Sequence, residues 1–265
     1  MTAPSLSAGI AGIGFWASGL PSWQAACGYA TGAALPADAP SRPSPQLLAP
    51  NERRRAPETV AVALEVALAA CNAAGRDPAT LSSVFASTHG DLNITDYMCE
   101  VLASEPHSLS PTRFHNSVHN AAAGYWTIGA GAMASATAIS AYDASFAQGL
   151  LEALAQLATG TDAVLLVACD GHASGPVARV SPSVGLLGAA LLLVRDPAPG
   201  MPRLQVAMEE GSNDNGSVGG PLSLLLAGNA MTPMLPLFEA LALQRTHATL
   251  GAGNGLALRI GIAHD

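Results

Sequence analysis

The chain has 265 residues and a formal net charge of −8, and only 11% of its residues are charged while 49% are hydrophobic. All 11 basic residues are arginines, so the chain has no lysine for a Walker-type phosphate loop or a Schiff base, and it has no basic stripe for nucleic acid. A chain this apolar can bury enough surface to fold, and its few charges suggest that a partner covers part of that surface.

No apolar run approaches the ~20 residues that span a bilayer, and the first residues lack the basic group that opens a signal peptide. The cysteines are scattered and form no C-x-x-C pair, which predicts reduced thiols and a cytoplasmic protein. They are Cys27, Cys71, Cys99 and Cys169.

Apolar runs alternate with helical periodicity along the chain. The runs predict strands at 6–15, 82–88, 136–141, 163–169, 184–195, 204–210 and 256–262. The periodicity predicts helices at 57–74, 91–103, 118–131, 144–159 and 233–250, and Gly75 ends the first of these. This alternation indicates an α/β protein with a mostly parallel sheet covered on both faces.

Gly12-Ile13-Gly14-Phe15-Trp16-Ala17 follows the first predicted strand and matches a G-x-G-x-x-A dinucleotide turn. The match is weak, because Pro21 stands where a helix should begin and Asp38 lies beyond the acidic position expected about 20 residues on. We therefore expect a tight turn at the end of the strand, and no cofactor.

Two other patterns supply part of a zinc site and part of a hydrolase triad, and neither is complete. His115 and His119 are four residues apart and could share a helix face for zinc, but no third ligand stands beside them, so no metal is predicted. Ser145, Asp143 and Asp170 could supply a hydrolase triad together with a histidine, but the G-x-S-x-G elbow is absent.

The most informative segments are Asn120-Ala121-Ala122-Ala123-Gly124 and, further on, Ser140-Ala141-Tyr142-Asp143-Ala144-Ser145. This arrangement resembles the N-terminal half of the beta-ketoacyl synthases, which have a thiolase-like fold. In that family an Asn-x-Ala-Ala-Gly helix precedes a strand ending in Thr-Ala-Cys, and the cysteine accepts the acyl group at a helix N-terminus. The resemblance covers roughly 10–194. It implies one domain over 1–265, a thiolase-like half with a mixed, mostly parallel five-stranded sheet, a core at about 6–195 and a reduced C-terminal region at 196–265.

Departures from the family pattern bear directly on activity. The nucleophile position falls on Tyr142, or on Asp143 if the register slips by one, and a phenol with a pKa near 10 is a poor acyl acceptor at neutral pH. Residues after 194 include His247 and His264 but no lysine and none of the family's second-half motifs. We therefore predict no catalytic residue. Tyr142 is expected either to fill a vestigial pocket or to shape a partner's tunnel.

A half-length ketosynthase without its nucleophile resembles a chain-length-factor subunit, and the motifs look similar to those of the short ketosynthase-like proteins of aryl polyene pathways. The resemblance implies a heterodimer with a full-length beta-ketoacyl synthase that acts on acyl carrier protein thioesters, with no nucleic acid partner. The alternative is a stand-alone acyl hydrolase or acyltransferase that uses Ser145, Cys169 or a His115/His119 metal site.

The resemblance also implies which residues meet the partner. In the family the strand before the nucleophile pairs across a two-fold axis. The corresponding residues here are Ala136, Thr137, Ala138, Ile139 and Ser140, with Tyr125 and Trp126 on the preceding helix.

In related chain length factors the helix after the second strand faces the partner's tunnel. The predicted tunnel residues are therefore Thr95, Tyr97, Met98 and Leu102. Two stripes lie at helical spacing on this helix, and we expect one to pack on the sheet and the other to meet the partner, with core packing as the alternative for either.

Overall fold

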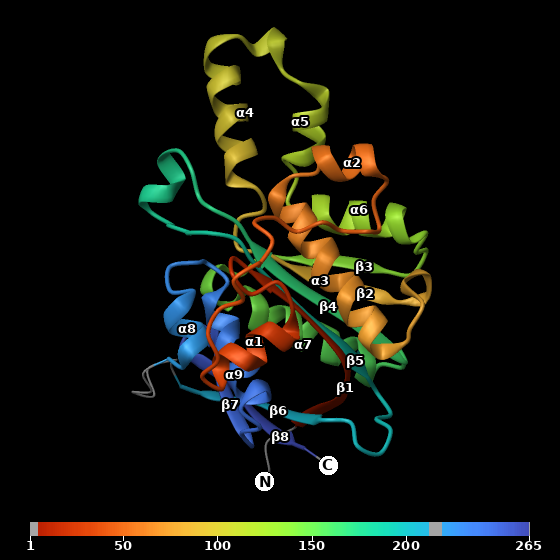
Figure 1. Ribbon diagram of the computed structural model, residues 1–265. Coiled ribbons are helices and arrows are strands. Elements are labelled where there is room, and N and C mark those ends of the chain that lie inside the picture. Colours follow the sequence, from red (N-terminus) through yellow and green to blue (C-terminus); the bar gives the residue numbers. More distant parts are fainter. Residues whose placement is uncertain (1–4, 212–218, 265) are drawn as a thin grey trace.

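The computed structural model describes residues 5–211 and 219–264. Their strands form one mixed sheet of eight strands in the order β3-β2-β4-β5-β1-β6-β8-β7, with helices on both faces (Figure 1). The strands are β1 Ser5–Ala17, β2 Ser82–Ala86, β3 Ala136–Ile139, β4 Ala163–Asp170, β5 Leu187–Val194, β6 Arg203–Glu210, β7 His247–Gly253 and β8 Leu256–Ala263. The α-helices are α1 Trp23–Ala30, α2 Pro50–Arg55, α3 Glu58–Ala74, α4 Leu92–Ser104, α5 Pro111–Asn116, α6 Ala121–Ala130, α7 Ser145–Ala158, α8 Pro221–Leu225 and α9 Leu235–Ala242.

The predicted mixed α/β architecture is confirmed, but the expectation of about five mostly parallel strands is wrong. Within the described residues, β2 pairs in parallel with β3 and with β4, while every other neighbouring pair is antiparallel. Helices connect the strands of both parallel pairs, as a crossover requires, whereas the antiparallel β4 and β5 are joined by a loop with only a short 3₁₀ turn. Residues 203–263 add β6, β8 and β7 to the same sheet.

One predicted helix is also wrong over half its length. The segment 233–250 was expected to be helical, but α9 ends at Ala242 and β7 begins at His247. Gln244 has a φ of 52°, which breaks the helix, and Ala248, Leu250 and Ala252 are then buried at strand spacing. The other predicted strands and helices are present, with boundaries that differ by a few residues.

Helix α3 lies against the sheet at backbone distance, and three glycines make this possible. A Cβ on Gly12 would come within 2.1 Å of the Ala70 carbonyl oxygen, and one on Gly14 within 2.0 Å of the Val66 carbonyl oxygen. Gly188 in β5 makes room for the Val62 side chain instead, whose Cγ2 would be 2.8 Å from an added Cβ. Gly12 and Gly14 therefore lie inside β1, so the expected tight turn is wrong; they serve close helix packing and not a dinucleotide turn.

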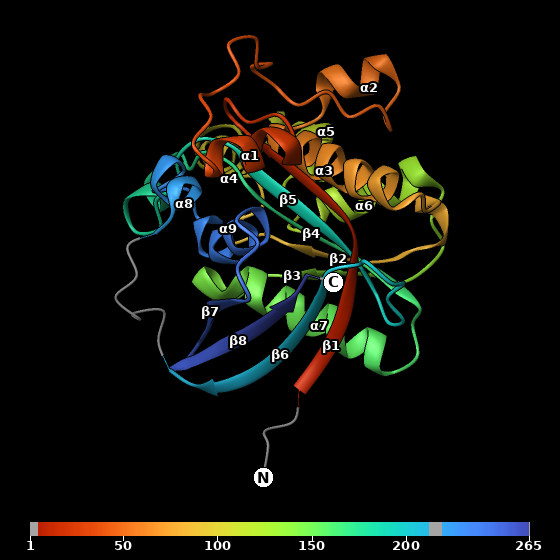
Figure 2. The same ribbon diagram turned by 60° about the horizontal axis from the view of Figure 1, so that its bottom comes forward.

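On the opposite face the sheet curls around α7. Figure 2 shows β6, β8 and β7 passing beneath this helix. Gln148 on α7 donates a hydrogen bond to the Ala252 carbonyl oxygen of β7 at 2.7 Å, which ties the far edge of the sheet back to the helix. The C-terminal strands thus close the core around α7, and their outer face carries exposed polar side chains such as Arg203, Gln205 and Arg259.

Helix α4 does not pack on the sheet, contrary to expectation. It projects from the body beside α5, and it packs mainly on α5 and on the 3₁₀ turn Pro106–Ser108 (Figure 1). Asp91 caps its N-terminus by accepting a hydrogen bond from the Ile94 N–H at 3.1 Å. No helix in the described ranges is both long enough and apolar enough to cross a membrane.

The glycine contact between β1 and α3 predicts a specific loss of stability. Gly14→Ala should lower the free energy of unfolding by about 1–3 kcal/mol, because the new methyl group would meet backbone that cannot move alone. Urea unfolding followed by circular dichroism measures this. The control is Gly28→Ala in α1, where the added Cβ would find its nearest neighbour, the Ala33 Cβ, at 3.7 Å. It should be neutral or stabilising by about 0.5–1 kcal/mol. Equal stabilities for Gly14→Ala and the parent would contradict the close contact.

Candidate functional site

The three parallel strands have their carboxyl ends on the same side of the sheet. They bring together chain segments that are far apart in the sequence. Thr88 follows β2, Tyr142 follows β3, and Asp170 ends β4. The carboxyl ends of parallel strands are where α/β proteins usually bind ligands. This side of the sheet is therefore the candidate functional site.

Asp170 is completely buried, and it holds together the chain segments at this candidate site. Its carboxylate accepts hydrogen bonds from the Ser87 hydroxyl at 2.7 Å, the Thr88 N–H at 3.0 Å and the His89 N–H at 3.3 Å. Burial raises the pKa of the Asp170 carboxyl above its ordinary value, and the bonds from Ser87 and Thr88 oppose that shift. The Asp170 carbonyl oxygen also accepts a hydrogen bond from the buried Asn229 amide at 3.2 Å. The backbone after β2 is thereby fixed to β4 and to the C-terminal region.

The turn from β3 into α7 is sharp and places Tyr142 at its apex. Tyr142 has a φ of 53°, in the left-handed region that side chains other than glycine rarely adopt. Ser145 holds the turn closed, because its hydroxyl donates to the Tyr142 carbonyl oxygen at 2.6 Å and accepts from the Ala141 N–H at 2.9 Å. The Tyr142 side chain is 57% exposed. It therefore fills no buried pocket within this chain and projects from the turn.

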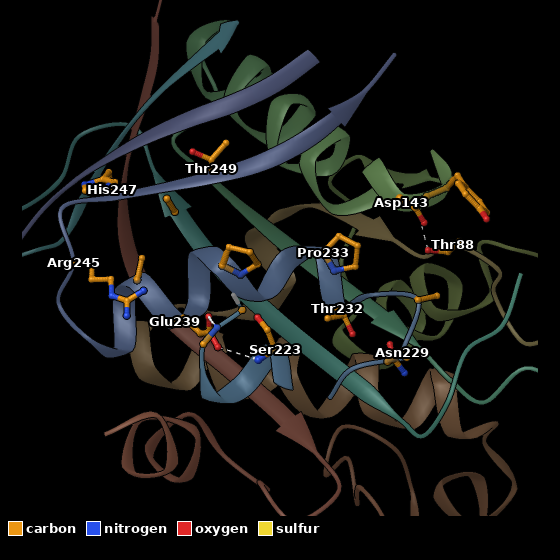
Figure 3. Close-up of a pocket in the computed structure, with 18 of the residues that line it drawn as sticks. Thr88, Asp143, Ser223, Asn229, Thr232, Pro233, Glu239, Arg245, His247 and Thr249 are labelled. Carbon is orange, nitrogen blue, oxygen red and sulfur yellow. Dashed lines mark hydrogen bonds between the residues drawn. The ribbon is translucent and has the colours of Figure 1, made fainter. Parts of the chain in front are cut away.

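Beside this turn lies a hollow of about 860 Å³ between the site and the C-terminal region. Figure 3 shows Thr88 and Asp143 at one end of it and Arg245 and His247 at the other. Glu239 on its wall is buried, and its carboxylate accepts hydrogen bonds from the Gly220 and Ser223 N–H groups at 3.0 and 2.9 Å. That carboxylate is occupied in capping α8. No cysteine lines the hollow among the described residues.

The nucleophiles considered from the sequence have structural roles here. Ser145 is buried in the turn just described, and Cys169 is buried against the Thr59 carbonyl oxygen, 3.6 Å from its Sγ. Burial raises the pKa of the Cys169 thiol, so the reactive thiolate is disfavoured. Ser181 lies 3.2 Å from His89 Nε2 at the edge of the hollow, but in the described part of the chain no group bonds the other ring nitrogen of His89 to orient it.

The histidine pair does not form a metal site. α5 ends at Asn116, so His115 lies on the helix while His119 lies in the turn that follows. His119 Nε2 is 2.8 Å from the Ser87 carbonyl oxygen, and the His115 ring packs against Tyr125 with 6.0 Å between centroids. The described residues contain no cluster of three or more metal-ligating side chains.

The predicted partner strand forms a free edge of the sheet. β3 pairs only with β2 among the described strands; Ala136 and Ala138 are exposed, and Thr137 and Ile139 are half-buried. Beyond the strand, the Ser140 hydroxyl donates to the Thr88 carbonyl oxygen at 3.1 Å.

The two aromatic residues expected beside this strand differ. Tyr125 is half-buried and donates a hydrogen bond from its hydroxyl to Asn116 Oδ1 at 3.0 Å. Trp126 is fully buried against Phe85, so its assignment to the partner surface is wrong; it can only support that surface from below. Sequence reasoning missed Ile128 and Met133, which are 80% and 95% exposed beside β3. Gly131, which ends α6 in a left-handed conformation, was the only sequence signal for this turn.

The four predicted tunnel residues all lie on α4 but differ in exposure. Met98 is buried and Leu102 is 55% exposed, while Thr95 and Tyr97 are half-buried. The Thr95 hydroxyl donates to the Asp91 carbonyl oxygen at 3.0 Å. Sequence reasoning missed the neighbour of Tyr97, which is Arg113 on α5, with its guanidinium carbon 3.8 Å from the centre of the tyrosine ring.

Comparison with known proteins places this geometry in a family. The family model described as beta-ketoacyl synthase, N-terminal domain, matches residues 23–219. In the complex of a ketosynthase (ApeO) with its chain length factor (ApeC) from Xenorhabdus doucetiae, a chain superposes with a TM-score of 0.76 at 23% identity, covering 97% of this chain and 99% of that one. A search of curated proteins returned no match.

Two further solved complexes have the same fold. A chain in the AntDE:AntF complex of a type II polyketide synthase acyl-carrier protein with its ketosynthase gives a TM-score of 0.74 at 12% identity, covering 99% of this chain and 100% of that one. A chain of the ishigamide ketosynthase/chain length factor gives 0.71 at 14%, covering 97% and 99%. These likenesses establish the thiolase-like ketosynthase fold.

The buried carboxylate at the site predicts a measurable stability defect. Asp170→Asn would replace an acceptor oxygen with an amide donor that faces the N–H groups of Thr88 and His89. It should lower the free energy of unfolding by about 1–3 kcal/mol, measured by urea unfolding. Asp196→Asn is the matched control, because the Asp196 side chain is exposed and its ion pair with Arg195, at 3.3 Å, lies at the surface; it should change stability by less than about 0.5 kcal/mol. Similar losses for both variants would refute the organising role of Asp170.

Proposed function

We propose that this chain, which belongs to the beta-ketoacyl synthase family through its match to that family's N-terminal domain, is a non-catalytic subunit of the chain-length-factor type. It would pair with a full-length ketosynthase, complete that enzyme's structure and shape its acyl tunnel. Through the pair it would act on chains carried by acyl carrier protein. The observation that carries this proposal is the free edge of β3 with its uncharged surroundings.

An unpaired strand edge invites association, and proteins usually protect such edges with charges or cover them. β3 contains no charged residue, and the exposed side chains of Ile128 and Met133 flank it. Backbone pairing along β3 together with burial of these side chains would give a partner both hydrogen bonds and apolar contact. We therefore infer an obligate heterodimer that buries over ~2,000 Å² in total.

The chemistry of the turn after β3 supports a subunit without catalytic activity of its own. By the resemblance, the position of the family's acyl-accepting cysteine falls on Tyr142, or on Asp143 if the register slips by one, and neither is a cysteine. Tyr142 has the strained backbone, with a φ of 53°. The buried Cys169 and Ser145 offer no accessible nucleophile. A turn of this shape without a cysteine suits a subunit that uses the fold to pair with a ketosynthase and does not carry out acyl transfer itself.

Similar proteins suggest the pathway. Chains of two complexes that contain a chain length factor match this chain over nearly its whole length. With the Ala141-Tyr142-Asp143-Ala144-Ser145 turn, this likeness supports a type II fatty-acid- or polyketide-like pathway, for which we propose aryl polyene pigment synthesis in the cytoplasm. All four cysteines are free, as expected for a reducing compartment.

The first test concerns assembly through β3. Ala138→Arg, or Thr137→Glu, should abolish co-purification with the partner ketosynthase, because either change places a charge on the paired edge. The matched control is Gln205→Arg, which changes an exposed position on β6 and should leave co-purification intact. If the chain is a stable monomer by light scattering in the presence of the partner, or if Ala138→Arg co-purifies as well as Gln205→Arg, the proposed pairing is wrong.

The second test concerns catalytic competence. Incubated with acyl carrier protein thioesters, the purified chain should show no stoichiometric acyl adduct by intact-mass spectrometry. Cys169 is buried with a raised thiol pKa, and the exposed Cys99 lies on α4 and does not line the hollow. The partner ketosynthase in the same reaction is the positive control. An adduct on this chain that persists in Tyr142→Phe would indicate a stand-alone acyl hydrolase or acyltransferase instead.

A further inference from the structure

The hairpin of α4 and α5 is held by few contacts. It stands away from the sheet in Figure 1, and α4 buries only Leu92 and Met98. Leu102 on α4 and Phe114 on α5 are more than half exposed. A helix with so little buried surface does not fix its own side chains by core packing, so individual contacts within the hairpin decide how they lie.

The contact between Tyr97 and Arg113 is such an interaction. The guanidinium carbon of Arg113 lies 3.8 Å from the centre of the Tyr97 ring, which is cation–π geometry. In the described part of the chain no carboxylate lies within ion-pair distance of Arg113. The α5 backbone holds the arginine in place, because the Ser110 hydroxyl accepts a hydrogen bond from the Arg113 N–H at 3.4 Å. The guanidinium is thus directed to the ring and not to an acid.

We propose that Arg113 is a positioning residue for Tyr97, and through it a determinant of product length. The inference rests on the proposed function and adds to it that α4, the helix the resemblance assigns to the tunnel, faces the partner's acyl chain. The stacked guanidinium covers one face of the ring, and because Tyr97 is only half-buried, part of the ring stays available to a growing chain. A cation–π contact at an exposed site corresponds to about a two- to fivefold preference for one ring orientation. Without Arg113 the ring would sample several orientations and define the tunnel end poorly.

The test uses the reconstituted heterodimer with acyl carrier protein and reads the product-length distribution by mass spectrometry. Arg113→Ala should raise the fraction of off-length products about two- to fivefold. Tyr97→Ala should raise it at least as much. Adding Arg113→Ala to Tyr97→Ala should change nothing further, since Arg113 acts through the ring. Arg113→Lys should recover part of the parent distribution, because an ammonium keeps the charge but not the planar stacking.

Controls separate positioning from general damage to the chain. Arg76→Ala removes an exposed arginine just beyond α3 and should give the parent distribution. Tyr97→Phe keeps the aromatic face and should also match the parent. Each variant is first checked for co-purification and thermal unfolding; if Arg113→Ala fails either check, Arg113→Gln takes its place.

The outcomes distinguish the two proposals. A parent distribution for Arg113→Ala, with a changed one for Tyr97→Ala, would overturn the positioning role and leave the proposed function intact. Independent, additive effects of the two substitutions would also overturn it. An unchanged distribution for Tyr97→Ala in an intact heterodimer would remove the length-determining role of α4, and the positioning role with it.

Discussion

The rest of this structure depends on the close packing of α3 against the sheet. Glycines at positions 12 and 14 remove the side chains that would hold the helix away, so its backbone meets β1 directly, and Gly188 makes room on β5 for the Val62 side chain of the helix. Close packing of this kind brings many atoms into van der Waals range over a small area. It fixes β1 and β5 in the middle of the sheet, and β4 and β2 follow from their pairing with β5 and with each other.

From that fixed centre the site at the carboxyl ends of the strands is built with buried polar groups. A buried carboxylate is costly unless donors satisfy it, and Asp170 meets this condition with a hydroxyl and backbone N–H groups and no cation. These donors belong to the segment after β2, and Thr88 in that segment reaches the Tyr142 carbonyl oxygen at 3.5 Å. The turn that carries Tyr142 is therefore positioned by the same network.

Inward-facing and outward-facing residues have different roles in this protein. Those directed inward, such as Cys169, Ser145 and Trp126, are committed to packing and to turns. Those directed outward along β3 and α6, such as Ala138 and Ile128, are uncharged, which suits recognition of another protein. Function follows from the site and its surface and not from the fold alone, because the same fold carries both catalytic and non-catalytic members.

Sequence patterns by themselves determined most of the helices and strands and the family, and they predicted that no cysteine stands at the nucleophile position. Each of these follows from local signals: periodicity, a capping Asp91, a terminating Gly75, and a tyrosine where a cysteine is expected. They also indicated β3 as the partner strand, which stays a prediction.

Only the tertiary structure decided where those elements go. It showed that Gly12 and Gly14 accommodate a helix, that 247–253 is a strand, that Trp126 is buried, and that Arg113 meets Tyr97. The reason is that each of these outcomes depends on atoms distant in the sequence. A glycine has the same local preference in a turn as under a helix, and short apolar runs suit a strand or a helix equally until neighbouring elements select one.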